Sequence, residues 1–226
     1  MRQRIDGLDL WRSAAVAAML AYHVLYDLEY FGVLAPGISG RPFALALRWA
    51  CAGRFLLISG AAARFSRSPL HRGFFLLCLG LAVTAVTLAA GQPVLFGILH
   101  CLGVCQMIYG AMRARVAGRD RRLFTLLCAA LFVGTAILTR RTMVDIRFLF
   151  PLGFRYEGFY SADYYPLMPW GFLFLIGTAI GETLEKRAGF RSFPRWTTFL
   201  GRHSLLIYLL HQPVLLGLVW AVNKLT

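Results

Sequence analysis

The sequence predicts an all-α membrane protein: a polytopic helix bundle of about seven transmembrane helices, formed by a single transmembrane domain over residues 1–226. Two observations lead to this fold class. Hydrophobic residues make up 58% of the chain, which is well above the usual share in soluble domains. Apolar runs of about 20 residues, the length at which a helix crosses a bilayer, recur along most of the sequence. The first run is not a cleaved signal peptide, because charges interrupt it and it continues to Phe31.

The predicted spans follow the apolar runs. They cover roughly residues 8–31, 43–63, 73–90, 94–112, 122–138, 164–184 and 202–222. Connections on one side of these spans (residues 1–12, 64–73, 113–122 and 186–202) hold sixteen Lys and Arg, against six on the other side. Because basic residues gather on the cytoplasmic side, we expect a cytoplasmic N-terminus and a C-terminus outside.

The net charge of +14 is therefore mainly a topology signal and does not indicate a nucleic-acid partner. A further role in attracting an anionic ligand in the cytoplasm stays open. For the basic connection at residues 113–122, anchoring to anionic lipid headgroups is the simplest interpretation.

The first span carries three ionisable residues, Arg12, His23 and Asp27. Such a residue costs roughly 2.5–3.5 kcal/mol at mid-bilayer, so each must face protein or water and is a candidate for function. The steps from Arg12 to His23 return to the same helix face about 16 Å further along the axis. Asp27 follows His23 by four residues, so the carboxylate could orient the imidazole. This stripe predicts a cation, a general base and its orienting group.

Two further polar residues lie within spans. Arg54 in the second span needs a carboxylate, a phosphate or a group of carbonyls, so phosphate binding and an ion pair with Asp27 or another acid are both open. His100 in the fourth span is expected at a depth comparable with His23 and Asp27. It is either part of the same site or a hydrogen-bonded core residue.

The last span holds His211 beside Gln212 and Pro213. A proline within a helix frees a backbone carbonyl about one turn earlier, and polar neighbours commonly satisfy that carbonyl. His211 therefore has either this structural role or a role in the site.

The largest connection, Arg140 to Tyr165, mixes aromatic residues with charges, among them Glu157, Asp163 and Tyr164. It is too apolar for a free loop and too polar to span a bilayer. Aromatic rings beside carboxylates commonly hold a sugar, so a cap that binds substrate at the outer side is one interpretation. An ordinary aromatic belt at the membrane interface is the other.

The five cysteines all lie in apolar spans, and their odd number does not indicate a disulfide framework. Cys101 and Cys105 lie one helical turn apart beside His100, but the sequence offers no second cluster of metal ligands. We therefore expect these cysteines to be buried small apolar residues and not a metal site. The sequence contains no GxSxG, Walker, HExxH or CxxCH motif.

Four blocks resemble, in order and over nearly the whole chain, the bacterial members of the heparan-alpha-glucosaminide N-acetyltransferase catalytic-domain family. The blocks are LDLWRSAAVAAMLAYHVLYDLEYFG, GILHCLGV, FYSADYYPLMPWGFLFLIGTAIG and LGRHSLLIYLLHQPVLL. Arg12 and His23, with ten residues between them, also match the Arg-x10-His pattern of the related acyltransferase type-3 membrane enzymes.

The resemblance implies a membrane acetyltransferase that moves acetyl from cytoplasmic acetyl-CoA to an amino sugar or glycan on the outer side. It implies His23 as general base, Asp27 as its orienting group and His100 as a third catalytic residue. The implied acetyl-CoA ligands are Arg12, Arg54 and His211, and the implied substrate ligands are Asp163, Tyr164 and Glu157. His100, Asp163 and His211 would line the transfer site or the acceptor pocket.

The expected partners are acetyl-CoA, the glycan or amino-sugar acceptor and the lipid bilayer, and a homodimer stays open. The expected location is the bacterial inner (plasma) membrane, as a multi-pass protein. A transporter or flippase could use the same buried His, Asp and Arg residues as a proton relay. A bis-histidine haem protein could pair two of His23, His100 and His211.

Overall fold

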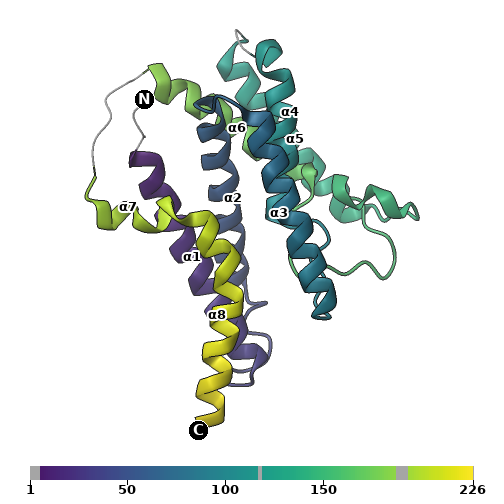
Figure 1. Cartoon of the computed structure of the whole chain (residues 1–226). Helices are drawn as coiled ribbons and strands as arrows, with labels where there is room; N and C mark the ends of the chain where they lie inside the picture. Colours follow the sequence, from purple (N-terminus) through teal and green to yellow (C-terminus); the bar gives the residue numbers. More distant parts are fainter. Residues whose placement is uncertain (1–5, 117–118, 187–192, 226) are drawn as a thin grey trace. The chain divides into compact units, whose positions relative to one another are not determined.

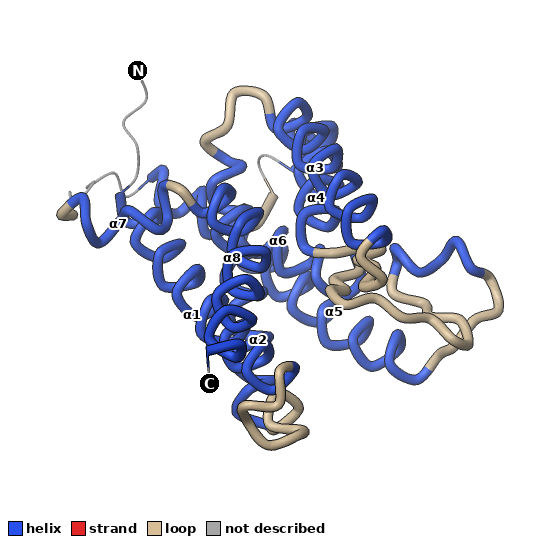
Figure 2. The backbone as a smooth tube through the Cα atoms, turned by 60° about the horizontal axis from the view of Figure 1, so that its bottom comes forward, coloured by secondary structure: helices blue, strands red, loops and turns tan. Residues whose placement is uncertain are grey.

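The computed structural model describes residues 6–116, 119–186 and 193–225. Four residues counted in the charge comparison, Arg2, Arg4, Arg187 and Arg191, lie outside these ranges. The described residues form helices joined by loops, and Figure 2 draws no strand among them, which confirms the all-α class. The elements are α1 (Asp6–Tyr30), α2 (Pro42–Arg64), α3 (Pro69–Ala89), α4 (Ile98–Val116), α5 (Arg121–Arg141), a 3-10 helix η1 (Arg147–Leu152), α6 (Leu167–Lys186), α7 (Arg195–Arg202) and α8 (Ser204–Leu225).

Five of the described helices, namely α2, α3, α5, α6 and α8, are long and apolar enough to cross a membrane. A multi-pass membrane protein is therefore confirmed as the class. The other two predicted spans form α1 and α4, which are long helices outside this set. The count of seven spans and the orientation of the termini stay predictions.

Two helical elements were not expected from the sequence. The short helix α7 lies in the basic connection before the last span, and η1 lies in the aromatic connection before α6. One side of α7 is buried at Thr198 and Gly201, whereas Trp196 and Phe199 are exposed. A short helix has one buried and one exposed side when it contacts a neighbouring helix on one side alone.

The chain divides into two compact units, with the division inside α2. The first, here called the α1/α8 unit, comprises Met1–Phe55 and Gly189–Thr226. The second, the α3–α6 unit, comprises Leu56–Ala188. One functional domain over residues 1–226 stays a prediction.

In the α1/α8 unit, α1 packs against α7 and runs beside α8 (Figure 1). Its apolar core centres on Val16 and Met19 of α1 and Cys51 of α2, with Leu200 and Ile207 packed against them. Burial of these side chains joins helices that are distant in sequence and fixes which face of α1 turns inward.

In the α3–α6 unit, α3 packs along α4 and α5 along α6 (Figure 1). Glycines stand where backbones approach most closely: a Cβ on Gly73 would meet the Gly103 carbonyl, and a Cβ on Gly177 would overlap the Leu57 carbonyl. Small residues of this kind let membrane helices approach closely enough for extensive van der Waals contact.

The connection between α5 and α6 folds against the start of α4. The Ala162 N–H donates to the Pro93 carbonyl over 2.9 Å, and the Tyr165 N–H donates to the Phe96 carbonyl over the same distance. The Phe159 ring contacts the Phe150 ring at 5.5 Å between centroids. Backbone bonds and stacked rings therefore give this aromatic segment a defined structure.

Candidate functional site

Two imidazoles meet in the α1/α8 unit. The rings of His23 on α1 and His211 on α8 lie 4.5 Å apart between centroids, edge to face. Nδ1 of His23 is 2.9 Å from the Met19 carbonyl, and Nδ1 of His211 is 2.6 Å from the Tyr208 carbonyl. Because a carbonyl can only accept, each Nδ1 carries the proton. In the neutral state each Nε2 therefore has the lone pair of a base.

A buried carboxylate lies one turn beyond His23. Asp27 is fully buried, and its Oδ1 accepts a 2.8 Å bond from Nε2 of Gln212 on α8. The other Asp27 oxygen, Oδ2, and Oε1 of Gln212 are buried without a hydrogen-bond partner among the described residues. Unsatisfied buried acceptors are costly, so two together favour a ligand that brings N–H or O–H donors.

The hydrogen bonds of His23 and Asp27 differ from the expected arrangement, in which the Asp27 carboxylate orients the His23 imidazole. Nδ1 of His23 is held by the Met19 carbonyl of its own helix, while the hydrogen bond of Asp27 goes to Gln212. Asp27 still follows His23 by one turn on the same face of α1. A role for Asp27 in orienting His23 stays a prediction.

Arg12 belongs to an ion cluster that joins α1 to α7. Its guanidinium lies 2.6 Å from Oδ1 of Asp9, a side chain that is only 1% exposed. Arg202 of α7 contacts Oδ1 of Asp6 at 3.0 Å and Oδ2 of Asp9 at 3.9 Å. Arg12 therefore has a structural ion pair, whereas Arg54 lies on α2 with an exposed side chain. Their roles as acetyl-CoA ligands stay predictions.

His100 lies in the α3–α6 unit. Its buried ring stacks on Phe96 at 5.5 Å between centroids, and its Nε2 is 3.3 Å from the Thr84 hydroxyl on α3. Its Nδ1 is buried without a hydrogen-bond partner in the described part of the chain. The contacts fit a core histidine that links α3 to α4, and the catalytic role stays a prediction.

The three expected substrate ligands have different surroundings in this unit. Oδ2 of Asp163 accepts from the Ile98 N–H over 3.2 Å, so the carboxylate caps α4. The Tyr164 hydroxyl donates to the Phe150 carbonyl over 2.6 Å, and burial raises the pKa of Tyr164 to about 12. Tyr164 is thus a protonated donor at neutral pH. Glu157 is exposed on the connection.

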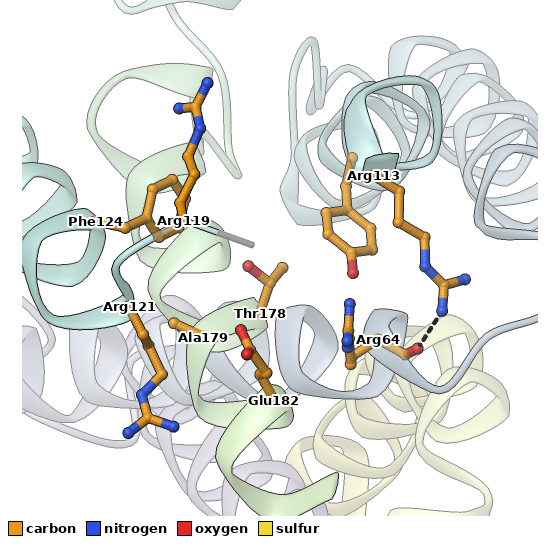
Figure 3. A pocket seen from close by; sticks show the side chains of 9 residues that line it. Arg64, Arg113, Arg119, Arg121, Phe124, Thr178, Ala179 and Glu182 are labelled. Carbon is orange, nitrogen blue, oxygen red and sulfur yellow. Dashed lines mark hydrogen bonds between the residues drawn. The ribbon is translucent and has the colours of Figure 1, made fainter. Parts of the chain in front are cut away.

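A third polar region, here called the arginine pocket, lies where α2, α4 and α6 end and α5 begins (Figure 3). Its cavity volume is about 20 Å³, and the depression reaches about 380 Å³ only when space open to solvent is counted. The charged residues that line it are Arg64, Arg113, Arg119, Arg121 and Glu182. In Figure 3, Arg119 lies beside Phe124, Arg121 lies apart from them with its side chain pointing the other way, and Arg64 and Arg113 lie on the other side of Thr178 and Glu182.

Sequence reasoning missed this pocket. It treated the arginines at residues 113–122 as a topology signal and as lipid anchors, because each one alone is an ordinary basic residue at the end of a span. The useful signal was that Arg64, this run and Glu182 all fall at helix ends on the same predicted side. A carboxylate that falls among several arginines indicates a shared pocket more specifically than the number of positive charges does.

All five cysteines are free thiols, and Sγ of Cys101 lies 4.0 Å from Sγ of Cys105. Among the described residues, no group of three or more His, Cys, Asp or Glu side chains could hold a metal ion. The buried polar side chains among the described residues carry imidazole, carboxylate, amide and hydroxyl groups.

Membrane-length helices define the class of this chain as an integral membrane protein, with two adjacent imidazoles in the α1/α8 unit and a group of guanidinium side chains in the α3–α6 unit. Residues 4–213 match the family model described as "Heparan-alpha-glucosaminide N-acetyltransferase, catalytic", and the chain belongs to this family. No curated protein and no solved structure matches the chain.

Family membership confirms the resemblance seen in the four sequence blocks and makes the protein a membrane acyltransferase by class. The relationship to the acyltransferase type-3 enzymes, the bacterial origin and a homodimer stay predictions.

Proposed function

We propose that this protein transfers an acetyl group from acetyl-CoA in the cytoplasm to an amino sugar or glycan on the outer side of a bacterial inner membrane. Its seven spans would leave the N-terminus in the cytoplasm and the C-terminus outside, as the positive-inside rule requires. Family membership supports the reaction class, since the family is that of an N-acetyltransferase catalytic domain.

The observation that carries the proposal is the polar cluster between α1 and α8, in which Asp27 and His211 are buried and His23 and Gln212 are half-buried. His23 offers Nε2 as a base, because its Nδ1–H is bonded to a carbonyl. The two unsatisfied acceptors, on Asp27 and Gln212, suit the N–H groups of an amine better than an apolar ligand. A basic nitrogen beside waiting acceptors supports activation of an amine or hydroxyl nucleophile.

In the proposed reaction, the nitrogen of a neutral amine attacks the thioester carbonyl carbon. A C–N bond forms, the C–S bond breaks, and CoA leaves as a thiolate that takes up a proton. Nε2 of His23 receives the proton that the amine nitrogen loses and returns it to the thiolate. His211 would share that proton, since its ring centroid lies 4.5 Å from that of His23. A direct transfer needs no acetylated histidine, because the base and both substrates suffice.

The remaining assignments follow the family resemblance. Arg12 and Arg54 would contact the CoA phosphates or the thioester end, with His211 beside them, and Asp27 would stabilise the imidazolium of His23. His100, Asp163, Tyr164 and Glu157 would serve the transfer site or the acceptor.

The decisive experiment compares His23→Ala with the wild-type protein in nanodiscs, following CoA release from acetyl-CoA with glucosamine as the acceptor probe. Loss of the general base should lower turnover by at least about 100-fold, the usual scale for general-base catalysis. CoA binding by the variant should equal that of the wild type, since the base does not hold the nucleotide.

His203→Ala is the matched control. His203 also bonds a backbone carbonyl through Nδ1, at 3.0 Å from Phe199, but its side chain is exposed at the end of α7. Turnover should be unchanged in this variant. Wild-type turnover in His23→Ala would remove His23 from the mechanism, and no CoA release by the wild type with any amino sugar would count against the activity itself.

A further inference from the structure

Helix α7 exposes its aromatic side chains and buries small ones. Trp196 is 80% exposed and Phe199 is 55% exposed, whereas Thr198 and Gly201 are buried. At 3.6 residues per turn, Arg195, Trp196 and Phe199 share one face of α7, and Gly201 lies on the opposite face. Exposed apolar surface costs about 25 cal/mol per Å² in water. This distribution therefore indicates that the aromatic face of α7 has an apolar environment.

The fold fixes which face of α7 is buried. The Gly201 N–H donates to the Ser13 hydroxyl oxygen of α1 over 2.8 Å, and a Cβ on Gly201 would overlap the Asp9 carbonyl. Arg202 adds its 3.0 Å contact with Asp6. Because these contacts hold one side of α7 against α1, the helix cannot turn Trp196 inward without breaking them.

The position of α7 in the chain places it at the end of a membrane-length helix. Only His203 separates α7 from α8, and in Figure 1 α7 crosses α1 near the start of α8. A stripe of apolar side chains on α8, spaced four residues apart, is more than half exposed, as expected of a surface that faces lipid. These side chains are Leu206, Leu210, Val214 and Leu218. With eight residues α7 is only about 12 Å long, too short to cross a bilayer itself.

A third exposed aromatic residue lies at the same level of the α1/α8 unit. Trp11 of α1 is 60% exposed, and the next residue, Arg12, meets α7: a Cβ on Gly201 would lie 3.0 Å from the Arg12 Cβ. Tryptophan is enriched where a membrane meets water, because its ring is apolar and its N–H can bond to water or headgroups. Trp11 and Trp196 together are typical of an aromatic belt at one membrane surface.

The charge of this region complements phospholipid headgroups. Residues 186–202 contain five Lys and Arg and no Asp or Glu. Asp6 of α1 contacts one of them, Arg202, whereas Arg195 is exposed on the aromatic face of α7. A basic residue beside aromatic ones on the exposed face of a short helix favours an anionic lipid surface over a protein partner.

We propose that α7 is an interfacial helix, which inserts Trp196 and Phe199 into the phospholipid surface of the membrane and places Arg195 among the anionic headgroups. The predicted orientation of the spans makes this the cytoplasmic surface. The inference does not rest on the proposed function, because it concerns only how the α1/α8 unit meets the bilayer. A second copy of the chain is the alternative occupant of this face, and the experiment separates it from lipid.

The proposal also sets the depth of the histidine pair. His23 follows Trp11 by twelve residues, which is about 18 Å along α1. With Trp11 at the surface, His23 lies near the middle of a hydrocarbon core of about 30 Å. The interfacial helix would thus hold the polar cluster of α1 and α8 deep in the membrane.

The test follows tryptophan fluorescence of the full-length protein in nanodiscs of phosphatidylcholine and phosphatidylglycerol, with and without dibrominated lipid. The contribution of Trp196 is the difference between the wild type and Trp196→Phe. We expect dibrominated lipid to quench this contribution strongly, and water-soluble acrylamide to quench it more weakly than free tryptophan.

Trp170→Phe is the matched control, because Trp170 is half-buried and its ring contacts those of Tyr165 and Phe132 at 5.2 and 6.1 Å between centroids. Its contribution should respond less to dibrominated lipid than that of Trp196. Quenching of Trp196 by acrylamide alone would place α7 in water and overturn the inference. Quenching by neither reagent would show that protein covers the face, as in a dimer, and would also overturn it.

Melting temperatures in the same nanodiscs give a second readout. Trp196→Ser should lower the melting temperature by at least about 2 °C, since it removes an apolar ring from lipid, and Trp196→Phe should largely retain it. Trp196 is chosen over Phe199, whose ring also contacts His203 at 4.5 Å between centroids. An exposed tryptophan in water should be replaceable by serine without loss, so equal stability of Trp196→Ser and the wild type would contradict the inference.

The headgroup contact is tested with Arg195→Gln. Its loss of melting temperature relative to the wild type should be larger in nanodiscs that contain phosphatidylglycerol than in phosphatidylcholine alone, because only the first lipid carries a net negative charge. Equal losses in the two lipids would overturn the assignment of Arg195 to anionic headgroups.

Discussion

In the α1/α8 unit, polar bonds connect the helices. Ser13 of α1 accepts from the Gly201 N–H of α7 over 2.8 Å, the Cys51 thiol of α2 donates to the Ala15 carbonyl of α1 over 3.2 Å, and Gln212 of α8 donates to Asp27 of α1. In the α3–α6 unit, backbones approach each other closely at several glycines, such as Gly177 against Leu57 and Gly103 against Leu77, and in the α1/α8 unit Gly201 approaches Asp9 in the same way.

This difference also extends to charge. The acids Asp6 and Asp9 of the α1/α8 unit are paired with Arg12 and Arg202, whereas the α3–α6 unit gathers arginines around an open pocket. Paired charges inside a helix contact stabilise the contact. The comparison teaches that the α1/α8 unit places its acid–arginine pairs between helices, whereas the α3–α6 unit gathers its arginines where helices end.

The largest effect is expected at a glycine contact. Gly177→Val would place side-chain atoms on the Leu57 carbonyl, which is backbone and cannot move aside. We expect a loss of about 3 kcal/mol or more, or roughly 10 °C in the melting temperature in detergent. Gly134→Val is the control, because no atom lies within 4 Å of a Cβ at Gly134. Equal melting temperatures for the two variants would show that the close approach at Gly177 does not stabilise the α3–α6 unit.

The next effect is expected at the ion cluster of the α1/α8 unit. Asp9→Asn keeps the shape of a buried side chain and removes the charge that Arg12 and Arg202 face. Because the two arginines are 21% and 26% exposed, solvent offsets part of the loss, and we expect about 2 kcal/mol. Asp6→Asn, at a carboxylate that is 19% exposed and contacts Arg202 at 3.0 Å, should cost less in the same thermal assay. A larger loss of stability in Asp6→Asn than in Asp9→Asn would show that burial of the carboxylate does not set its contribution to stability in this cluster.

The smallest effect is expected at an exposed carboxylate of the α3–α6 unit. Asp120 caps α5, and bonds from the Leu123 and Arg122 N–H groups hold its pKa below the usual value. Since the pKa is lower in the folded chain, the cap contributes fully above the unfolded pKa and is lost as the pH falls through the folded one.

Hydrogen exchange at the first turn of α5, corrected for the intrinsic pH dependence, measures this loss. Protection should fall at acidic pH in the wild type and stay level in Asp120→Asn. A level profile in both proteins would show that the carboxylate charge does not support the cap.

The helices themselves could be predicted from the sequence, because an apolar run of membrane length can adopt few structures other than a helix. Their boundaries were close: the predicted span 43–63 became Pro42–Arg64, and 122–138 became Arg121–Arg141. The short helix α7 could not be predicted, since its eight residues alternate polar and apolar groups that only the contact with α1 stabilises.

The candidate site shows the same contrast. His23 and Asp27 stood out because ionisable residues are rare and costly in an apolar helix, and their spacing fixed them on one face. The pairing of His23 with His211 could not be predicted, because it depends on how α8 packs against α1. The arginine pocket was not predicted, because arginines at helix ends are common and do not stand out in the sequence.

The two carbonyl bonds of Arg113 have a consequence for the freedom of its side chain. An arginine side chain gives up about 2 kcal/mol of rotamer entropy when it is immobilised. Arg113 has already lost that freedom on folding, because the Arg64 and Ser66 carbonyls at the end of α2 fix its guanidinium. Any anion that bound beside it would meet a pre-organised cation, and less of the binding free energy would be spent on ordering the protein.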